Sequence, residues 1–249
     1  MQMLAETAHI TRITIPFLDI DTAVFLIDTP DGRILFDTAT YPTDIDEYIL
    51  PTGIAPQMIV ISHNHRDHAG GLARAAECFP EAVIAAGSNA CAERIPGREV
   101  RVLADGELLA GCLRVVAIPG HTADAIGLID TRTMTLLSGD ALQCAGIYGS
   151  GNWGANISYQ RAHREACARL GGMGIAAILA SHDYHPCGRR ADGGGVARYL
   201  DACTSALDAI CDFVEAHPDM PPEALAAAYN GASGLPTVGA HIFAATRRG

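Results

Sequence analysis

Residues 60–71 of the chain are Val60-Ile61-Ser62-His63-Asn64-His65-Arg66-Asp67-His68-Ala69-Gly70-Gly71. Three imidazoles and one carboxylate therefore fall within six consecutive positions. They directly follow the apolar run 58–61, which is rich in β-branched residues, begins after Pro56 and predicts a buried strand. The polar side chains are thus expected at the carboxyl end of a strand, where open α/β sheets usually place their sites.

A single histidine is usually a solvated or hydrogen-bonded side chain, but this group favours a metal site. Imidazoles packed so closely would repel one another once protonated, and a bound metal ion holds them neutral. The ligand types and their spacing therefore predict a metal site on this loop.

Composition limits the class of protein. The 249 residues fit one large α/β domain or two small ones, with 49% hydrophobic and 18% charged residues, as in ordinary globular proteins. No apolar run approaches the roughly eighteen residues that span a bilayer. The first residues show neither a basic n-region nor an apolar h-region, so we expect no signal peptide.

The net charge and the cysteine pattern limit the partners, the chemistry and the cellular compartment that we expect for the protein. The net charge is −11 and all 17 basic residues are arginine, which disfavours nucleic acid and excludes Schiff-base chemistry on lysine. The eight cysteines form no Cys-x-x-Cys pair, which predicts reduced thiols in a cytoplasmic protein.

Histidine and aspartate recur where apolar runs end. Asp37 ends the second strand of a hairpin predicted for 22–28 and 33–37 around Pro30-Asp31-Gly32. His121 follows the run 113–118, Asp140 follows a second predicted hairpin, and His182 follows the run 175–180. Helices are expected at 158–170, with Ser158 as N-cap, and at about 197–216. The order of elements predicts partly antiparallel sheets and argues against a plain doubly wound fold.

Seven candidate ligands result: His63, His65, Asp67, His68, His121, Asp140 and His182. A structural zinc site has four protein ligands and no open coordination position. Seven ligands are too many for such a site and instead suit two ions that share a bridging carboxylate and a bridging water. No His-Glu-x-x-His helix is present, which excludes the common single-zinc protease arrangement.

These residues make the chain similar to the metallo-β-lactamase-fold metallohydrolases. The family signature, His-x-His-x-Asp-His followed by a single His, an Asp and a last His, matches the seven residues in order over about 30–185, and Asp37 matches a strand-end Asp of the family. The resemblance implies an αββα sandwich of two mixed sheets flanked by helices. We expect 1–249 to be one domain, with 193–249 as a helical extension packed on it.

The resemblance also divides the ligands between two ions. It implies His63, His65 and His121 at one ion, Asp67, His68 and His182 at the other, and Asp140 between them. Zinc is expected, with iron or manganese as alternatives.

The chemistry follows from the two ions. Together they would activate a bridging water to a hydroxide nucleophile, with Asp67 orienting it and moving a proton to the leaving group.

Further candidate residues are expected around the seven ligands. Asp37, Thr122, Asp124 and Asp183 are candidates to orient the imidazoles, with turn capping as the alternative, and Tyr148, Trp153, Tyr184 and His185 are candidates to line the substrate pocket.

Comparison with members of this family limits the substrate classes that we expect. Asp140 stands where β-lactam-hydrolysing members usually carry cysteine, which argues against antibiotic hydrolysis. Lactonases resemble the chain in length and ligands, but they often carry tyrosine where Gln143 stands. Glyoxalase II enzymes have a basic C-terminal region, whereas Arg198 is the single basic residue in 197–229 of this chain. We therefore predict a metal-dependent hydrolase of a small ester, lactone or thioester, acting in the cytoplasm without nucleic-acid or membrane partners, and in a homodimer if it assembles.

Three alternatives stay open. They are an oxidoreductase similar to the persulfide dioxygenases with one iron, a hydrolase of small phosphodiesters, and a protein that binds metal without catalysis.

Overall fold

The hairpin predicted around Pro30-Asp31-Gly32 forms part of the first of two sheets. Strands β3 (Ile20–Thr29) and β4 (Gly32–Phe36) pair antiparallel, with Leu26 opposite Leu35. Gly32 has a φ of 127°, which residues with a side chain rarely adopt, so the turn depends on glycine. Asp37 follows β4 directly and is completely buried.

The computed structural model describes residues 2–148 and 152–247, and in these ranges the strands form a seven-stranded and a six-stranded sheet. The first sheet has the order β1 to β7, antiparallel from β1 to β4 and parallel from β4 to β7. Its other strands are β1 (Gln2–Ala5), β2 (Ile10–Phe17), β5 (Pro56–Ile61), β6 (Val83–Ala86) and β7 (Val100–Val102).

The second sheet has the order β13-β12-β11-β10-β9-β8, with a single parallel pair, β11 and β12, among the described strands. Its strands are β8 (Leu108–Leu109), β9 (Leu113–Ala117), β10 (Ile126–Asp130), β11 (Thr135–Leu137), β12 (Ala177–Tyr184) and β13 (Gly188–Asp192). Both sheets are therefore mixed.

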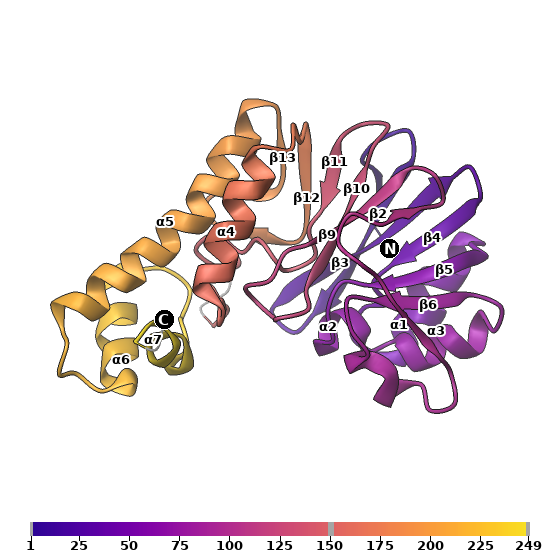
Figure 1. Cartoon of the computed structure of the whole chain (residues 1–249). Coiled ribbons are helices and arrows are strands. Elements are labelled where there is room, and N and C mark those ends of the chain that lie inside the picture. The colour runs from indigo at the N-terminus through magenta and orange to yellow at the C-terminus, as the bar shows by residue number, and fades with distance from the viewer. Residues whose placement is uncertain (1, 149–151, 248–249) are drawn as a thin grey trace.

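Helices cover the outer faces of both sheets (Figure 1). On the first sheet lie α1 (Pro42–Asp44), α2 (Arg66–Ala69) and α3 (Leu72–Cys78), and on the second lie α4 (Gln160–Gly171) and α5 (Gly194–Ala216). The chain then continues into α6 (Pro222–Ser233) and α7 (Ala240–Thr246), beside the far end of α5. Shorter helical turns occur at Ile45–Ile49, Leu50–Thr52 and Ala90–Arg94.

Three apolar layers hold the sandwich together. Between the sheets lie fully buried side chains of both, among them Phe25, Phe36, Val60, Val115 and Leu128. Separate clusters fill the space between the first sheet and α2 and α3, and between the second sheet and α4 and α5. Each fully buried large side chain contributes about 1.5–3 kcal/mol. The predicted αββα sandwich of two mixed sheets is confirmed.

The long helix α5 joins the sandwich to the C-terminal helices. Its first half, including Val196 and Leu200, packs with the second sheet and α4, and its second half, including Ile210 and Val214, packs with Ile242 and its neighbours on α6 and α7. Whether the chain unfolds as one domain stays a prediction. Among the described residues, no helix combines the length and the apolar character needed to cross a membrane.

Two element boundaries differ from those expected. Helix α4 begins at Gln160, after Tyr159 in the capping position, so Ser158 is not the N-cap. Strand β12 continues past residue 180 to Tyr184, because Tyr184 pairs with Gly188 across the turn to β13. His182 therefore lies within a strand and not on the loop after it.

Candidate metal centre

The loop after β5 is held close to the segment 37–41. Gly70 and Gly71 follow α2, and a Cβ atom on either glycine would collide with the carbonyl oxygen of Thr40 or Thr38. The backbone amide of Thr38 in turn donates to the carbonyl of His68 over 2.7 Å. The two glycines therefore let α2 lie against the end of β4, which brings His68 beside Asp37.

The seven predicted ligand residues meet at one edge of the sandwich, in two groups. The ligand atoms of His63, His65 and His121 all lie within 4.8 Å of one another, and so do those of Asp67, His68, Asp140 and His182. The two groups are adjacent, because the ring centroids of His63 and His68 are 4.3 Å apart. The ends of β5, β9, β11 and β12 supply these residues, although the segments are far apart in the sequence.

Several of these atoms are buried and make no well-aligned hydrogen bond among the described residues. They are Nε2 of His63, Nε2 of His68 and Oδ1 of Asp140, of which the last two face each other at 3.2 Å as an ion pair. A buried polar atom without a partner costs about 1–3 kcal/mol. Imidazole nitrogen and carboxylate oxygen are ligands of divalent metals, so a metal centre would satisfy these atoms and the residues fit one.

The first group is neutral at pH 7. Burial lowers the pKa of His63 well below its usual value, and burial likewise lowers the pKa of His121 to about 4. A neutral imidazole has a free nitrogen lone pair, so these rings are ready to bind a metal ion without losing a proton.

The second group is a cluster of paired charges. Burial lowers the pKa of His182, but the Asp140 carboxylate raises it further, to about 10. Burial raises the pKa of Asp140, but His182 and His68 hold it well below the usual range. The Nε2 atom of His182 lies 3.1 Å from Asp67 and 3.3 Å from Asp140. A metal ion at this group therefore has to displace protons.

Asp37 orients His68. Its Oδ2 atom lies 2.7 Å from Nδ1 of His68 and accepts a hydrogen bond from the Ser62 hydroxyl at 2.9 Å, while its Oδ1 atom accepts one from the Ser62 backbone amide at 2.7 Å. Asp37 has a φ of 66°, a left-handed conformation that aspartate tolerates better than most residues. The contact leaves Nε2 of His68 to face Asp140.

The other imidazoles are oriented by groups that the sequence did not single out. Nδ1 of His121 lies 2.7 Å from the Asn156 carbonyl and 3.0 Å from the Gln143 amide. Nδ1 of His182 lies 2.6 Å from the Asp21 carbonyl. Two of these partners are main-chain oxygens, which every residue carries, so residue type gives no signal for them.

Three residues expected to orient imidazoles make no hydrogen bond to them within the described residues. Asp124 accepts a hydrogen bond from Ser88, and Asp183 is 3.9 Å from Arg189. The Thr122 hydroxyl is buried without a hydrogen-bond partner among the described residues. Within the described chain, none of Thr122, Asp124 and Asp183 is hydrogen-bonded to a predicted ligand, because groups from other elements already occupy those ring nitrogens.

A small pocket of about 90 Å³ opens over the cluster. It is lined by five of the predicted ligands and by Ile20, Gln143, Ile147, Trp153, Gly154, Asn156 and Tyr184. Trp153 donates to Asp19 over 2.9 Å and packs on Phe17 with ring centroids 5.8 Å apart. The buried hydroxyl of Tyr184 lies near the Asp140 carboxylate, one of the predicted ligands that line the same pocket.

Two predicted pocket residues lie outside this pocket. The rings of Tyr148 and His185 pack together with centroids 4.7 Å apart. His185 lines a separate cavity of about 290 Å³, which is mostly apolar and lies beside α5 and α6. Main-chain hydrogen bonds pair the segment 145–148 with 183–185, and neither Tyr148 nor His185 lines the pocket over the cluster.

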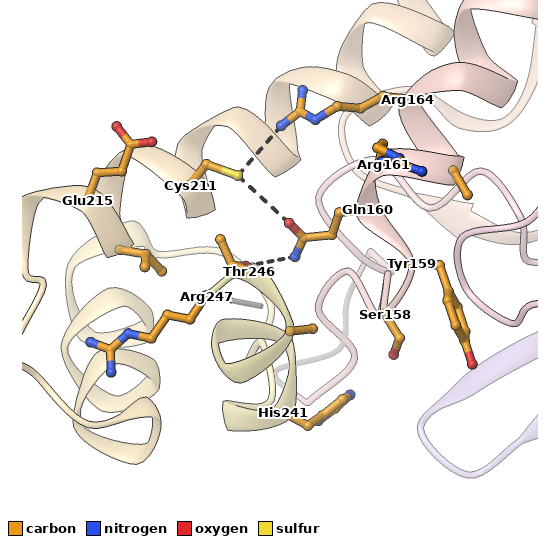
Figure 2. A pocket seen from close by; sticks show the side chains of 13 residues that line it. Ser158, Tyr159, Gln160, Arg161, Arg164, Cys211, Glu215, His241, Thr246 and Arg247 are labelled. Carbon is orange, nitrogen blue, oxygen red and sulfur yellow. Dashed lines mark hydrogen bonds between the residues drawn. The ribbon is translucent and has the colours of Figure 1, made fainter. Parts of the chain in front are cut away.

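A larger cavity, of about 1000 Å³, lies between α4, α5 and α7 (Figure 2). It contains none of the seven predicted ligands. Some of its polar side chains bond one another, as Gln160 donates to Thr246 over 2.7 Å and Arg164 to Cys211 over 3.6 Å, whereas Arg161 and Arg247 bond groups outside the lining. The clustered ligands and their shifted pKa values therefore make the smaller pocket the candidate functional site.

Comparison with known proteins agrees with this geometry. A metallo-beta-lactamase family protein from Thermus thermophilus superposes with a TM-score of 0.71 at 19% identity, covering 98% of this chain and 92% of that one, which shows the shared fold. Two curated relatives are named hydroxyacylglutathione hydrolase. The one from Edwardsiella ictaluri is 27% identical over 51% of this chain, and the one from Shewanella pealeana is 30% identical over 50%.

The chain spans about half the length of these curated relatives, 49% and 44% respectively. The family model of the metallo-beta-lactamase superfamily matches residues 19–182, which contain every predicted ligand. That match covers more than half of the chain. The chain therefore belongs to the metallo-beta-lactamase superfamily.

Proposed function

We propose that the protein is a binuclear metal-dependent hydrolase of a small ester, lactone or thioester. The observation that carries the proposal is the meeting of two adjacent ligand groups, one neutral and one charged, at a small pocket. The hydroxyacylglutathione hydrolase relatives, which match about half of the chain, support an acyl substrate such as a thioester.

The ligand groups suggest how two ions would be held. His63, His65 and His121 would hold one, Asp67, His68 and His182 the other, and Asp140 would be shared. Zinc is the metal we propose, with iron or manganese as alternatives. Bound there, the ions would supply Lewis-acid polarisation of the substrate and an activated water.

Asp67 is the residue we propose for proton transfer. Its side chain is 15% exposed and lines the pocket, so a substrate can reach it. Burial raises the pKa of Asp67, but His68 and His182 hold it well below the usual range, so it is a carboxylate at pH 7. As a carboxylate it can accept a proton from the attacking water and pass it to the leaving group.

Tyr184 and the apolar wall position the substrate. Burial raises the pKa of Tyr184 well above its usual value, with Asp140 adding to the effect, so the phenol keeps its proton. It therefore acts as a hydrogen-bond donor toward the substrate carbonyl. Ile20, Ile147 and Trp153 line the same pocket and favour an apolar acyl group over bulk water.

The net charge of −11 supports a small-molecule substrate over nucleic acid. All eight cysteines are free thiols, which supports the proposed cytoplasmic location. A homodimer and the absence of a membrane partner belong to the same proposal.

The test is a substrate panel on the full chain loaded with zinc. The panel holds aryl esters, lactones, S-acyl glutathione thioesters and an aryl phosphodiester. We expect turnover of an acyl substrate, and a loss of at least a hundredfold in Asp67→Asn but not in Asp46→Asn, an exposed carboxylate paired with Arg74. Turnover of the phosphodiester alone would contradict the acyl class. One tightly bound iron with oxygen uptake on glutathione persulfide would contradict hydrolysis.

A further inference from the structure

The segment that joins α6 to α7 lies against one wall of the metal pocket. That wall is the segment 153–156, three residues of which line the pocket. The amide of Gly154 donates to the Thr237 carbonyl over 2.9 Å. A Cβ atom at position 154 would lie 2.6 Å from the carbonyl oxygens of Pro236 and Thr237, so the two main chains are in direct contact. The C-terminal helices therefore reach the metal pocket through this connecting segment.

The connecting segment is itself held by α6. The side chain of Asn230 accepts a hydrogen bond from the Val238 amide over 2.9 Å and donates one to the Val238 carbonyl over 3.0 Å. Val238 is buried in the apolar cluster that α5, α6 and α7 share. The position of the segment therefore depends on the packing of the C-terminal helices.

His241, in the first turn of α7, bonds the same wall two residues after Gly154. Its Nε2 atom lies 2.8 Å from Oδ1 of Asn156, and because a carboxamide oxygen only accepts, the imidazole is the donor. The ring packs on Gly239, where a Cβ atom would lie 2.6 Å from it. Figure 2 shows His241 on α7 among the residues that line the larger cavity. The packing and the hydrogen bond together fix the direction of the ring.

Asn156 connects His241 to the predicted ligand His121. The Asn156 carbonyl oxygen lies 2.7 Å from Nδ1 of His121, and because this oxygen only accepts, Nδ1 carries the proton. Nε2 of His121 then has the free lone pair, and it lies 2.7 Å from Nδ1 of His65 within the first ligand group. The Asn156 amide donates to Gln143 over 2.7 Å. Asn156 is thus held by contacts with His121, Gln143 and His241.

We propose that His241 is a positioning residue, which acts through Asn156 to hold the His121 ring with Nε2 toward the proposed metal centre. The proposal gives the C-terminal helices a part in the metal site. It rests on the proposed metal centre but on no particular substrate. His241 does not line the metal pocket, and its hydrogen bond is exposed to solvent. We therefore expect loss of this bond to weaken metal binding about threefold to tenfold, as for one ordinary hydrogen bond.

Two variants separate the hydrogen bond from the ring packing. His241→Phe keeps a ring on Gly239 but cannot donate, whereas His241→Gln keeps an N–H donor without the ring. In competition with a fluorescent chelator, His241→Phe should bind zinc about threefold to tenfold more weakly than the wild type, and His241→Gln should recover most of the affinity.

His217→Phe is the matched control. It also removes a histidine hydrogen bond in the C-terminal region, because Nδ1 of His217 lies 2.9 Å from the Phe213 carbonyl, but His217 does not bond the pocket wall. We expect its zinc affinity to equal that of the wild type. Equal affinity in wild type and His241→Phe, or an equal loss in His217→Phe, would overturn the proposal.

A second readout uses the metal-free full chain, so it is independent of the proposed function. Nuclear magnetic resonance of the chain with ¹⁵N-labelled histidine, assigned with His121→Asn, should show His121 protonated on Nδ1. In His241→Phe this proton should exchange faster with solvent, whereas His217→Phe should keep the wild-type signal. An unchanged His121 signal in His241→Phe would refute the assignment. The expected change in a chain that binds no zinc would support the assignment and contradict the proposed function.

Discussion

Oδ2 of Asp37 lies 2.7 Å from Nδ1 of His68, and both side chains are completely buried. The carboxylate also accepts two hydrogen bonds from Ser62, so its position is fixed from both strands that precede the site. The contact links the end of β4 to the ligand-bearing loop after β5. It decides which nitrogen of His68 faces the proposed metal centre.

Replacement of Asp37 by asparagine tests this contact. We expect a loss of about 10–100-fold in metal affinity, because the imidazole loses the charged partner that orients it and raises its basicity. Competition with a fluorescent chelator measures the effect, with Asp46→Asn as the exposed control. Unchanged affinity in a folded Asp37→Asn protein would show that the Asp37 contact is structural only.

Replacement of Tyr184 by phenylalanine removes one buried hydroxyl and little else. We expect kcat to fall about 10–100-fold, the cost of one hydrogen bond to a charged or developing-charge group. Metal content should stay at the wild-type value, because the hydroxyl is proposed to bond the substrate. Steady-state kinetics and metal analysis together check this, and a fall in metal content with no fall in kcat per metal would contradict it.

Metal binding at pH 7 should release protons. The pKa of His182 is raised to about 10 in the metal-free protein, so the ring is protonated at pH 7 and must lose that proton to bind an ion. Apparent metal affinity should therefore rise as the pH increases from 7 toward 10.

Calorimetry in two buffers of different ionisation enthalpy counts the released protons. His182→Asn should release about one proton fewer than the wild type. His121→Asn should show no such change, because the pKa of His121 is lowered to about 4 and the ring is already neutral. Equal proton release in wild type and His182→Asn would contradict the charge assignment.

The C-terminal helices offer a stability test. Ile242 is completely buried among residues of α5, α6 and α7, so Ile242→Ala should reduce the free energy of unfolding by about 2–5 kcal/mol. If α5 couples these helices to the sandwich, calorimetry should show one transition shifted to lower temperature. Arg161→Ala, with a side chain 89% exposed, is the control. Two separate transitions would contradict the prediction of a single domain.

The sequence predicted the parts of the molecule that residue type and strand patterns encode. His or Asp at strand ends identified all seven residues of the cluster, and the hairpin marked by Pro30-Asp31-Gly32 indicated a partly antiparallel sheet. The αββα sandwich itself was predicted from the resemblance to the family that these seven residues carry. The sequence could not predict the main-chain oxygens of Asp21 and Asn156 that hold His182 and His121, because every residue carries a carbonyl. The sequence also could not predict that Tyr148 and His185 lie outside the pocket, because their placement depends on the pairing of two segments that are far apart in the chain.

Metal stoichiometry tests the central claim most directly. The full chain, loaded with zinc and freed of excess metal, should hold two equivalents per chain by elemental analysis. Asp140→Ala, which removes the carboxylate between the two groups, should hold one equivalent or less while keeping its fold by circular dichroism. A folded wild-type protein that retains no metal, or an Asp140→Ala variant that still holds two equivalents, would contradict the binuclear centre.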